Sequence, residues 1–244
     1  MRLSVSYALA GCFLGLGAPL GSLVWRLFIQ PQGGFHATLG HEWQIASYYY
    51  LYMTLGSVMT FGAFGYILGH RGEALSTLSV TDGLTGIYNH RYLQEQLAHE
   101  VQRADRYHTP LTCLMLDIDD FKKVNDQHGH LFGDKILKTA ARLIQDTIRG
   151  TDVAGRYGGE EFLIIMPQTT ADAALPIADR IVKAVQEQAF TDARKTVHVT
   201  VSIGLAMYPA FTLGIKTKSS LLSAADQALY RAKRSGKNQT VIYS

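Results

Sequence analysis

Charge is scarce at the start of this chain. Residues 1–69 carry only three charged side chains, which are Arg2, Arg26 and Glu42. The whole chain of 244 residues contains 23 Lys and Arg and 20 Asp and Glu. Two uncharged stretches result, Leu3–Trp25 and Trp43–Gly69. Each is longer than the roughly 20 residues that a helix needs to cross the hydrocarbon core of a bilayer. We therefore expect residues 1–69 to form a membrane region with two transmembrane helices, about 3–25 and 43–69.

The ends of this region bear on its orientation and on two alternative interpretations. Arg2 and Arg71 flank the pair of stretches, whereas the connecting loop has only Arg26, so both termini are expected on the cytoplasmic side. Both stretches could instead be buried helices of a soluble protein, but the rest of the chain offers too little apolar surface to cover them. The first could also be a signal peptide, although it runs long and lacks a convincing cleavage site.

Cysteine is also rare, and net charge is small. Cys12 and Cys113 are the two cysteines, both in apolar contexts and far apart, which excludes a disulfide framework and a cysteine metal clip and favours a reducing compartment. The formal net charge is +3, so composition gives no indication of nucleic-acid binding.

The loop Arg26–Glu42, which connects the two uncharged stretches, is too short to be a folded sensor.

Small residues are spaced regularly within the two stretches. Gly11 and Gly15 lie four residues apart, as do Gly65 and Gly69. Such pairs let helices approach each other closely in lipid. We expect helix contacts at these positions, either within one hairpin or between two chains.

Beyond the membrane region, the sequence predicts a linker followed by one α/β domain. Residues 70–80 are polar with Leu75 and Leu78 at helical spacing, which predicts a short linker or stalk helix. In residues 81–244, segments typical of strands and helices alternate. Strands are predicted at 111–120, 153–157, 162–166, 197–207 and 239–242, and helices at 131–148, 170–188 and 221–233. A further helix is predicted after the turn or cap at Asp82 and Thr85 and runs through about Ala104. This order predicts a mixed central sheet flanked by helices.

Acidic residues gather at two predicted strand ends. Asp117 and Asp119 end an apolar strand, and Glu160 and Glu161 follow the glycines of the predicted hairpin turn RYGGEEF. Carboxylates from neighbouring strand ends suit a hard cation such as Mg²⁺, and glycines let a nucleotide approach the backbone. The pattern predicts metal-assisted phosphate chemistry; a solvated hairpin tip with an unoccupied acidic cluster is the alternative.

Four motifs resemble those of the GGDEF family of diguanylate cyclases. RYGGEEF at 156–162 resembles the family signature in its GGEEF form, and three further segments match in order and spacing: DGLTGIYN at 82–89, DIDDFKKVNDQHGH at 117–130 and ADQALYRAKRSGKN at 225–238. The resemblance covers roughly 79–244 and implies a palm-like nucleotide-cyclase fold, with 81–244 as the GGDEF catalytic domain. It implies that two GTP molecules are condensed into cyclic di-GMP with release of two pyrophosphates. One domain holds one GTP, so the family acts as a homodimer.

The resemblance also implies roles for individual residues. Asp117, Glu160 and the Ile118 carbonyl would hold Mg²⁺, two ions per active site, with Mn²⁺ as a substitute. Asp117, Glu160 and Glu161 would be the catalytic acids, the role of Glu161 being left open. The substrate-binding residues would be Asn125 and Asp134 at guanine, Phe121, Lys122, Lys233 and Lys237 at the phosphates, and Gly158 and Gly159 at the turn. Without the resemblance, Asn125 and Asp134 could be capping residues and the two C-terminal lysines a solvated helix end.

Regulation and location follow from the same resemblance. Arg149 and Asp152 match the family's RxxD product-inhibition site, five residues ahead of the signature glycines, so cyclic di-GMP would be both product and inhibitor. With the two spans, the resemblance implies a multi-pass protein of the cytoplasmic (inner) membrane, in contact with lipid, with its catalytic domain in the cytoplasm. A catalytically silent module that binds GTP or cyclic di-GMP is the second hypothesis, and the retained metal acids favour the enzyme.

Overall fold

The chain divides into two compact units. The structure is a computed structural model that describes residues 3–17, 20–21, 24, 48, 51–70, 79–192, 195–209 and 215–244. The units are Met1–Ser79 and Val80–Ser244. The loop 26–42 and most of the predicted linker, residues 71–78, lie outside the described residues.

Two helices of the first unit pack closely through glycines. They are α1, Leu3–Gly15, and the helix Leu51–His70. A Cβ added to Gly11 would overlap the carbonyl oxygen of Phe61, and one added to Gly65 would overlap that of Tyr7. Only glycine permits this approach of the two backbones, so the predicted glycine contact is found within one chain.

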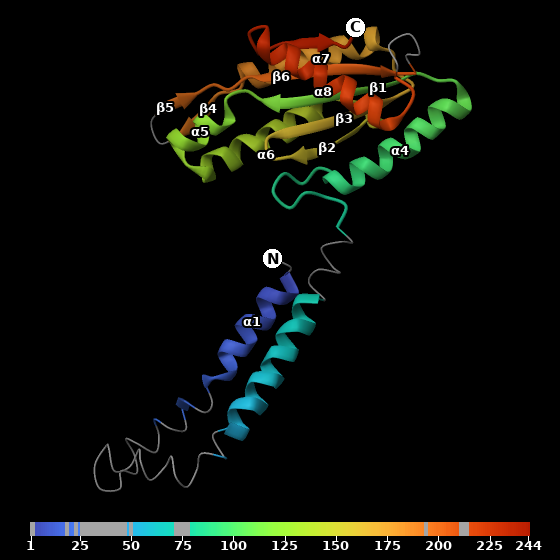
Figure 1. The fold of residues 1–244 in the computed structure, drawn as a ribbon. Coiled ribbons are helices and arrows are strands. Elements are labelled where there is room, and N and C mark those ends of the chain that lie inside the picture. Colours follow the sequence, from blue (N-terminus) through green and yellow to red (C-terminus); the bar gives the residue numbers. More distant parts are fainter. Residues whose placement is uncertain are drawn as a thin grey trace. The chain divides into compact units, whose positions relative to one another are not determined.

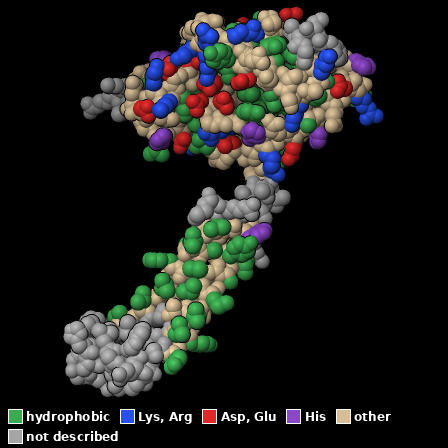
Figure 2. Space-filling model, in the orientation of Figure 1, with side chains coloured by type: hydrophobic (Ala, Val, Ile, Leu, Met, Phe, Trp, Pro, Cys, Tyr) green, Lys and Arg blue, Asp and Glu red, His purple; other side chains and the backbone are tan. Residues whose placement is uncertain are grey.

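One described helix has the length and composition of a membrane span. Leu51–His70 is 20 residues long and contains an 18-residue window with a mean hydropathy of 1.4, whereas α1 is apolar but shorter, at 13 residues. Hydrophobic side chains cover the outward surfaces of both helices (Figure 2). Among the described residues, the first predicted span, 3–25, is a continuous helix only over Leu3–Gly15.

The second unit is built on a mixed five-stranded sheet (Figure 1). Its order is β2-β3-β1-β6-β7, with β1 antiparallel to β3 and β6, and β6 parallel to β7. The strands are β1 Leu111–Ile118, β2 Val153–Gly158, β3 Glu161–Pro167, β6 Val201–Tyr208 and β7 Thr240–Ile242. This confirms the predicted mixed sheet.

Helices cover both faces of the sheet. One face packs against α4, His90–Tyr107, and α8, Lys218–Arg234; the other packs against α6, His130–Thr147, and α7, Ala171–Glu187. All eight residues of β1 are therefore buried. A strand covered on both faces has no solvent-exposed side, which explains why β1 is apolar except at Thr112 and Asp117.

Two short elements were not predicted. The helix α5, Phe121–His128, precedes α6, and a two-stranded hairpin, β4 Phe190–Asp192 and β5 Lys195–Val197, precedes β6. The strand predicted at 197–207 consequently begins at Val201. Three-residue strands show no measurable periodicity, and α5 buries only Phe121, so neither element has an apolar pattern that sequence analysis detects.

Candidate active site

The predicted acids meet at the edge where β1 ends and the β2–β3 hairpin turns. Asp117 lies directly opposite Glu161 in the β1–β3 ladder. The turn itself consists of Gly159, with φ of 42°, and Glu160. A positive φ is accessible to glycine without strain, so Gly159 shapes the turn that presents both glutamates.

Asp117 is a buried carboxylate that is paired with Lys233 and lies close to two glutamates. Burial is the main cause that raises the pKa of Asp117 to about 6; the Lys233 ammonium, with Nζ 2.7 Å from Oδ2, opposes this shift, and Glu160 and Glu161 add to it. Crowded carboxylates of this kind are stabilised by a bound cation. The electrostatics at Asp117 therefore fit a divalent metal ion.

The adjacent glutamates face different cavities. Glu160 lines a cavity of about 490 Å³ beside α5 and α6. Glu161 lines one of about 230 Å³ with Tyr230 and Lys233 of α8. The two signature acids thus have separate surroundings, which their adjacency in the sequence does not reveal.

Asp119 does not belong to the acidic cluster. Its carboxylate accepts hydrogen bonds from Thr200 Oγ1 and Ser202 Oγ, each at 2.7 Å, and from the backbone N–H of Asn238 at 3.2 Å. These three donors occupy both carboxylate oxygens. The sequence groups Asp119 with Asp117 at the end of one strand, but the structure gives its carboxylate hydroxyl partners that lie more than 80 residues away in the chain.

The larger cavity contains an unsatisfied polar group. Asn125 of α5 and Asp134 of α6 both line it. Asn125 Oδ1 is buried and has no hydrogen-bond partner among the described residues. Buried polar atoms nearly always have a partner, so Asn125 is a side chain that the folded domain leaves incompletely satisfied beside the cavity.

Gly133 keeps Asn125 in this position. A Cβ at Gly133 would overlap Asn125 Oδ1, so any larger residue would displace the amide. Sequence analysis did not identify Gly133, because the contact depends on how α5 packs against α6.

The start of α5 is open to an anion. Phe121 and Lys122 occupy its first turn, and Asp120 makes no side-chain cap hydrogen bond. The first N–H groups of a helix lack intrahelical partners and attract negative charge. Asp120 instead pairs with Lys123 and Lys237, each at 2.7 Å, and these hydrogen bonds lower its pKa to about 2.

Both predicted C-terminal lysines lie at this edge. Lys233 contacts Asp117, and Lys237 contacts Asp120, each at 2.7 Å. The structure therefore places Lys233 beside the acidic cluster and Lys237 beside the start of α5, each in an ion pair with a carboxylate.

Arg156 and Asp82 form a link that sequence analysis missed. Arg156 donates from Nε and Nη2 to the Gly159 carbonyl at 2.9 and 2.7 Å, and its Nη1 lies 3.3 Å from Asp82 Oδ1. Asp82 also accepts hydrogen bonds from the backbone and hydroxyl of Thr85, as predicted for a turn. These contacts connect the turn at Gly159 and Glu160 to the segment DGLTGIYN at 82–89, which is the first motif of the domain.

Arg149 lines a third cavity and is hydrogen-bonded to Asp152. The backbone N–H of Arg149 donates to Asp152 Oδ2 at 2.9 Å, while Asp152 Oδ1 is buried without a partner among the described residues. Burial raises the pKa of Asp152. The cavity, of about 390 Å³, is also lined by Arg103 of α4, which sequence analysis did not include.

The acids alone do not form a complete metal site, and water and substrate phosphates would have to supply the remaining ligands. Within the described ranges, no three His, Cys, Asp or Glu side chains gather into a ready-made metal site. Mg²⁺ is commonly held by one or two carboxylates, with water and substrate phosphates completing its shell. Asp117, Glu160 and the Ile118 carbonyl match this smaller set of ligands.

Comparison with known proteins gives one consistent family. Residues 79–239 match the family described as "Diguanylate cyclase, GGDEF domain". The chain is 44% identical over 167 residues to the response regulator PleD of Caulobacter vibrioides, covering 67% of this chain and 36% of PleD. It is 35% identical over 175 residues to the probable diguanylate cyclase DgcC of Escherichia coli, covering 72% of this chain and 46% of DgcC.

Solved structures agree with this assignment. The GGDEF domain of DgcB from Caulobacter crescentus, in complex with c-di-GMP, matches with a TM-score of 0.64 and 30% identity, covering 68% of this chain and 96% of that one. The active GGEEF domain of a diguanylate cyclase from Vibrio cholerae matches with a TM-score of 0.60 and 35% identity, covering 64% and 97%. These matches confirm the palm-like α/β fold.

The matched segments show which part of this chain resembles its relatives. The chain spans less than half the length of the two curated relatives described above. The family match, in contrast, covers residues 79–239, well over half of the 244 residues. This chain therefore belongs to the diguanylate cyclase GGDEF-domain family.

Proposed function

We propose that this chain is a diguanylate cyclase of the GGEEF variant, which condenses two GTP molecules into cyclic di-GMP and two pyrophosphates. The observation that carries the proposal is the cavity of about 490 Å³ between α5, α6 and the signature turn, with Asn125, Asp134 and Glu160 in its lining. The bound c-di-GMP in the related DgcB domain supports the same chemistry.

The cavity lining explains the choice of guanine. Asp134 can accept hydrogen bonds from the N1–H and 2-amino groups of guanine, and adenine lacks both donors. Asn125 Oδ1 would gain its missing partner from the same base edge. The base would therefore lie between α5 and α6, with its phosphates toward the signature turn.

The phosphates would meet donors and positive charge. The first-turn N–H groups of α5, at Phe121 and Lys122, would donate to the terminal phosphates. Lys233 and Lys237 would move from Asp117 and Asp120 onto phosphate oxygens. Because both lysines already lie at the edge of the site, only their side chains need to reorient.

Asp117, Glu160 and the Ile118 carbonyl would hold Mg²⁺, or Mn²⁺ as a substitute, with two ions per site. When bound, the metal polarises the phosphates and eases ionisation of the attacking hydroxyl. Glu161, opposite Asp117, adds negative charge that favours the cation.

The reaction would require two copies of the chain. A cavity of about 490 Å³ has room for one nucleotide, whose size is typical of pockets of this volume. The 3′-hydroxyl that attacks each α-phosphate must then come from the GTP of a second domain facing the first. A homodimer thus supplies the alignment that accounts for much of the rate.

The membrane region would tether the enzyme. Leu51–His70 and the region beginning with α1 would form two spans in the cytoplasmic membrane, in contact with lipid and with the catalytic domain in the cytoplasm. The hydropathy of Leu51–His70 and the close glycine packing of the two helices support this arrangement.

A product assay tests the proposed activity. The purified full chain is incubated with Mg²⁺ and either GTP or ATP, and products are identified by mass spectrometry. We expect cyclic di-GMP and pyrophosphate from GTP, no cyclic dinucleotide from ATP, and activity per molecule that rises with protein concentration. GTP binding without turnover at any concentration would instead favour a catalytically silent binding module.

Gly133→Ala is expected to raise KM for GTP about tenfold with little change in kcat. The new methyl group would displace the Asn125 amide, which removes one hydrogen bond to the base, worth about a factor of ten. Steady-state kinetics measure the effect. Gly83→Ala is the matched control, since a Cβ there meets nothing within 4 Å; equal KM values for the two variants would contradict the assignment of Asn125.

Arg149→Ala is expected to weaken inhibition by cyclic di-GMP at least about tenfold, because a charge-assisted contact is lost. The hydrogen bond to Asp152 comes from the backbone of Arg149, so the substitution removes the guanidinium and keeps the turn. Inhibition constants for the variant and for Arg142→Ala, an exposed arginine of α6, provide the comparison. Unchanged inhibition in Arg149→Ala would show that the product binds elsewhere.

A further inference from the structure

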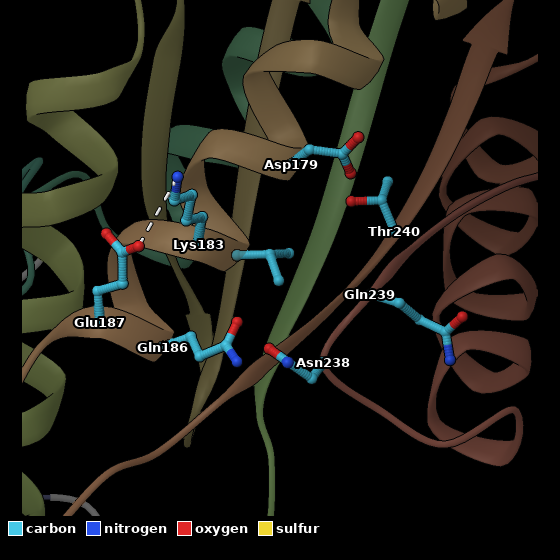
Figure 3. Close-up of a pocket in the computed structure, with 8 residues that line it drawn as sticks. Asp179, Lys183, Gln186, Glu187, Asn238, Gln239 and Thr240 are labelled. Carbon is cyan, nitrogen blue, oxygen red and sulfur yellow. Dashed lines mark ion pairs between the residues drawn. The ribbon is translucent and has the colours of Figure 1, made fainter.

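A fourth cavity lies away from the proposed active site, between α7 and the segment leading into β7. It has a volume of about 680 Å³, within the range of small-molecule sites. Its lining comes from one stripe of α7 and from three consecutive residues before and in β7: Asp179, Val182, Lys183, Gln186, Glu187, Asn238, Gln239 and Thr240. Figure 3 shows Asp179 and Thr240 at one end, and Gln186 and Asn238 at the other. We call this cavity the α7–β7 slot.

Two of the residues that line the slot carry a side-chain oxygen without a hydrogen-bond partner. Asn238 Oδ1 and Thr240 Oγ1 are both buried and have no hydrogen-bond partner in the part of the chain that the structure describes. They lie at opposite ends of the slot (Figure 3). Since leaving such groups unpaired is costly, a ligand for the slot should carry donors at both ends.

The charge of the lining favours a cation. Lys183 is paired with Glu187 at 3.7 Å, so these two charges offset each other. Asp179 is the remaining charged lining residue, and it points toward Thr240 (Figure 3). An N–H donor with positive charge could bridge the Asp179 carboxylate and the Thr240 hydroxyl, whereas an anion would be repelled.

The length of the slot follows from helix geometry. Asp179 and Gln186 lie seven residues apart on α7, which corresponds to about 10 Å along the helix axis. Val182 lies between them in the sequence and is buried, so the middle of the slot has an apolar component. A ligand that reaches both ends is therefore elongated, with donors at its ends and methylene groups between.

The Asn238 end is held in place before any ligand binds. The backbone N–H of Asn238 donates to Asp119 Oδ2 at 3.2 Å, and the carboxylate of Asp119 is itself fixed by Thr200 and Ser202. Asn238 also has a positive φ of 48°. A preorganised acceptor lowers the entropy lost on binding.

We propose that the α7–β7 slot is a second ligand site that binds a linear aliphatic polyamine, with one amino group between Asp179 and Thr240 and the other near Gln186 and Asn238. The site is separate from the nucleotide cavity, with which it shares no lining residue. Binding there does not depend on the proposed cyclase activity.

Calorimetric titration of the full chain with spermidine tests the proposal. The buffer contains no nucleotide and about 150 mM salt, which screens weak surface binding. We expect saturable binding of one spermidine per chain, and no binding of 1,8-octanediol, a neutral molecule of similar length. Asp179→Asn should weaken binding at least about tenfold, since one charge-assisted hydrogen bond is lost, and Thr240→Val should weaken it as well.

Asp172→Asn is the matched control, because it removes an identical charge from the first turn of α7 without lining the slot. Equal affinity in Asp179→Asn and Asp172→Asn, or the absence of saturable spermidine binding, would overturn the proposal. Because the titration involves no turnover, its outcome is independent of whether the chain makes cyclic di-GMP.

Discussion

Glu160→Gln is expected to lower turnover of GTP by at least about 10³-fold while the domain stays folded. Metal stabilisation of developing charge is worth several kcal/mol, and each 1.4 kcal/mol corresponds to about a factor of ten. Glutamine keeps the size of Glu160 in the turn and removes only its charge. The measurements are single-turnover kinetics for activity and circular dichroism for folding.

Two comparisons make this prediction specific. Asp146→Asn removes an exposed carboxylate of α6, 65% accessible, and should leave turnover unchanged. Titration with Mn²⁺ should show a weaker apparent metal affinity in Glu160→Gln than in the parent. If the variant kept normal turnover and metal affinity, Glu160 would not be a metal ligand.

The sheet and its main helices were predictable because each has a clear apolar period. β1 is buried on both faces and appears in the sequence as an apolar run broken only by Thr112 and Asp117, while α6 and α7 repeat apolar residues at helical spacing. A helix or strand that buries one or both faces needs apolar residues at the buried positions, and these positions can be recognised in the sequence. The short elements α5, β4 and β5 bury too few residues to do so.

The site was predictable where acids stand at predicted strand ends and where a family motif gives a residue its role. The paired glutamates and the acidic end of β1 are visible in the sequence, and the family motifs give them roles. The separation of Asp117 from Asp119 was not visible, because it depends on hydroxyl donors of Thr200 and Ser202 on and beside β6. Gly133 was likewise missed, since its importance lies in the packing of α6 against Asn125.

The contact between Arg156 and Asp82 was also not predicted from the sequence. It leads to a second prediction with a large effect on turnover. The two residues are 74 positions apart, and their side chains are only 19% and 23% exposed. Through Arg156, Asp82 is connected to the Gly159 carbonyl at the turn that presents Glu160. Loss of the arginine would free this turn to move.

Arg156→Ala is expected to lower turnover about 10²-fold, since displacement of a reacting group by roughly 1 Å has an effect of that size. Asp82→Ala should lower it too, although Asp82 does not line the nucleotide cavity. If the pair acts as one unit, the double variant should be little worse than Arg156→Ala, with a coupling energy of about 0.5–3 kcal/mol in a double-mutant cycle. Arg142→Ala, an exposed arginine with a partner 4.0 Å away, is the control and should be additive with Asp82→Ala. Strict additivity of Arg156→Ala and Asp82→Ala would mean that Arg156 acts on the nucleotide alone and that the first motif does not hold the signature turn.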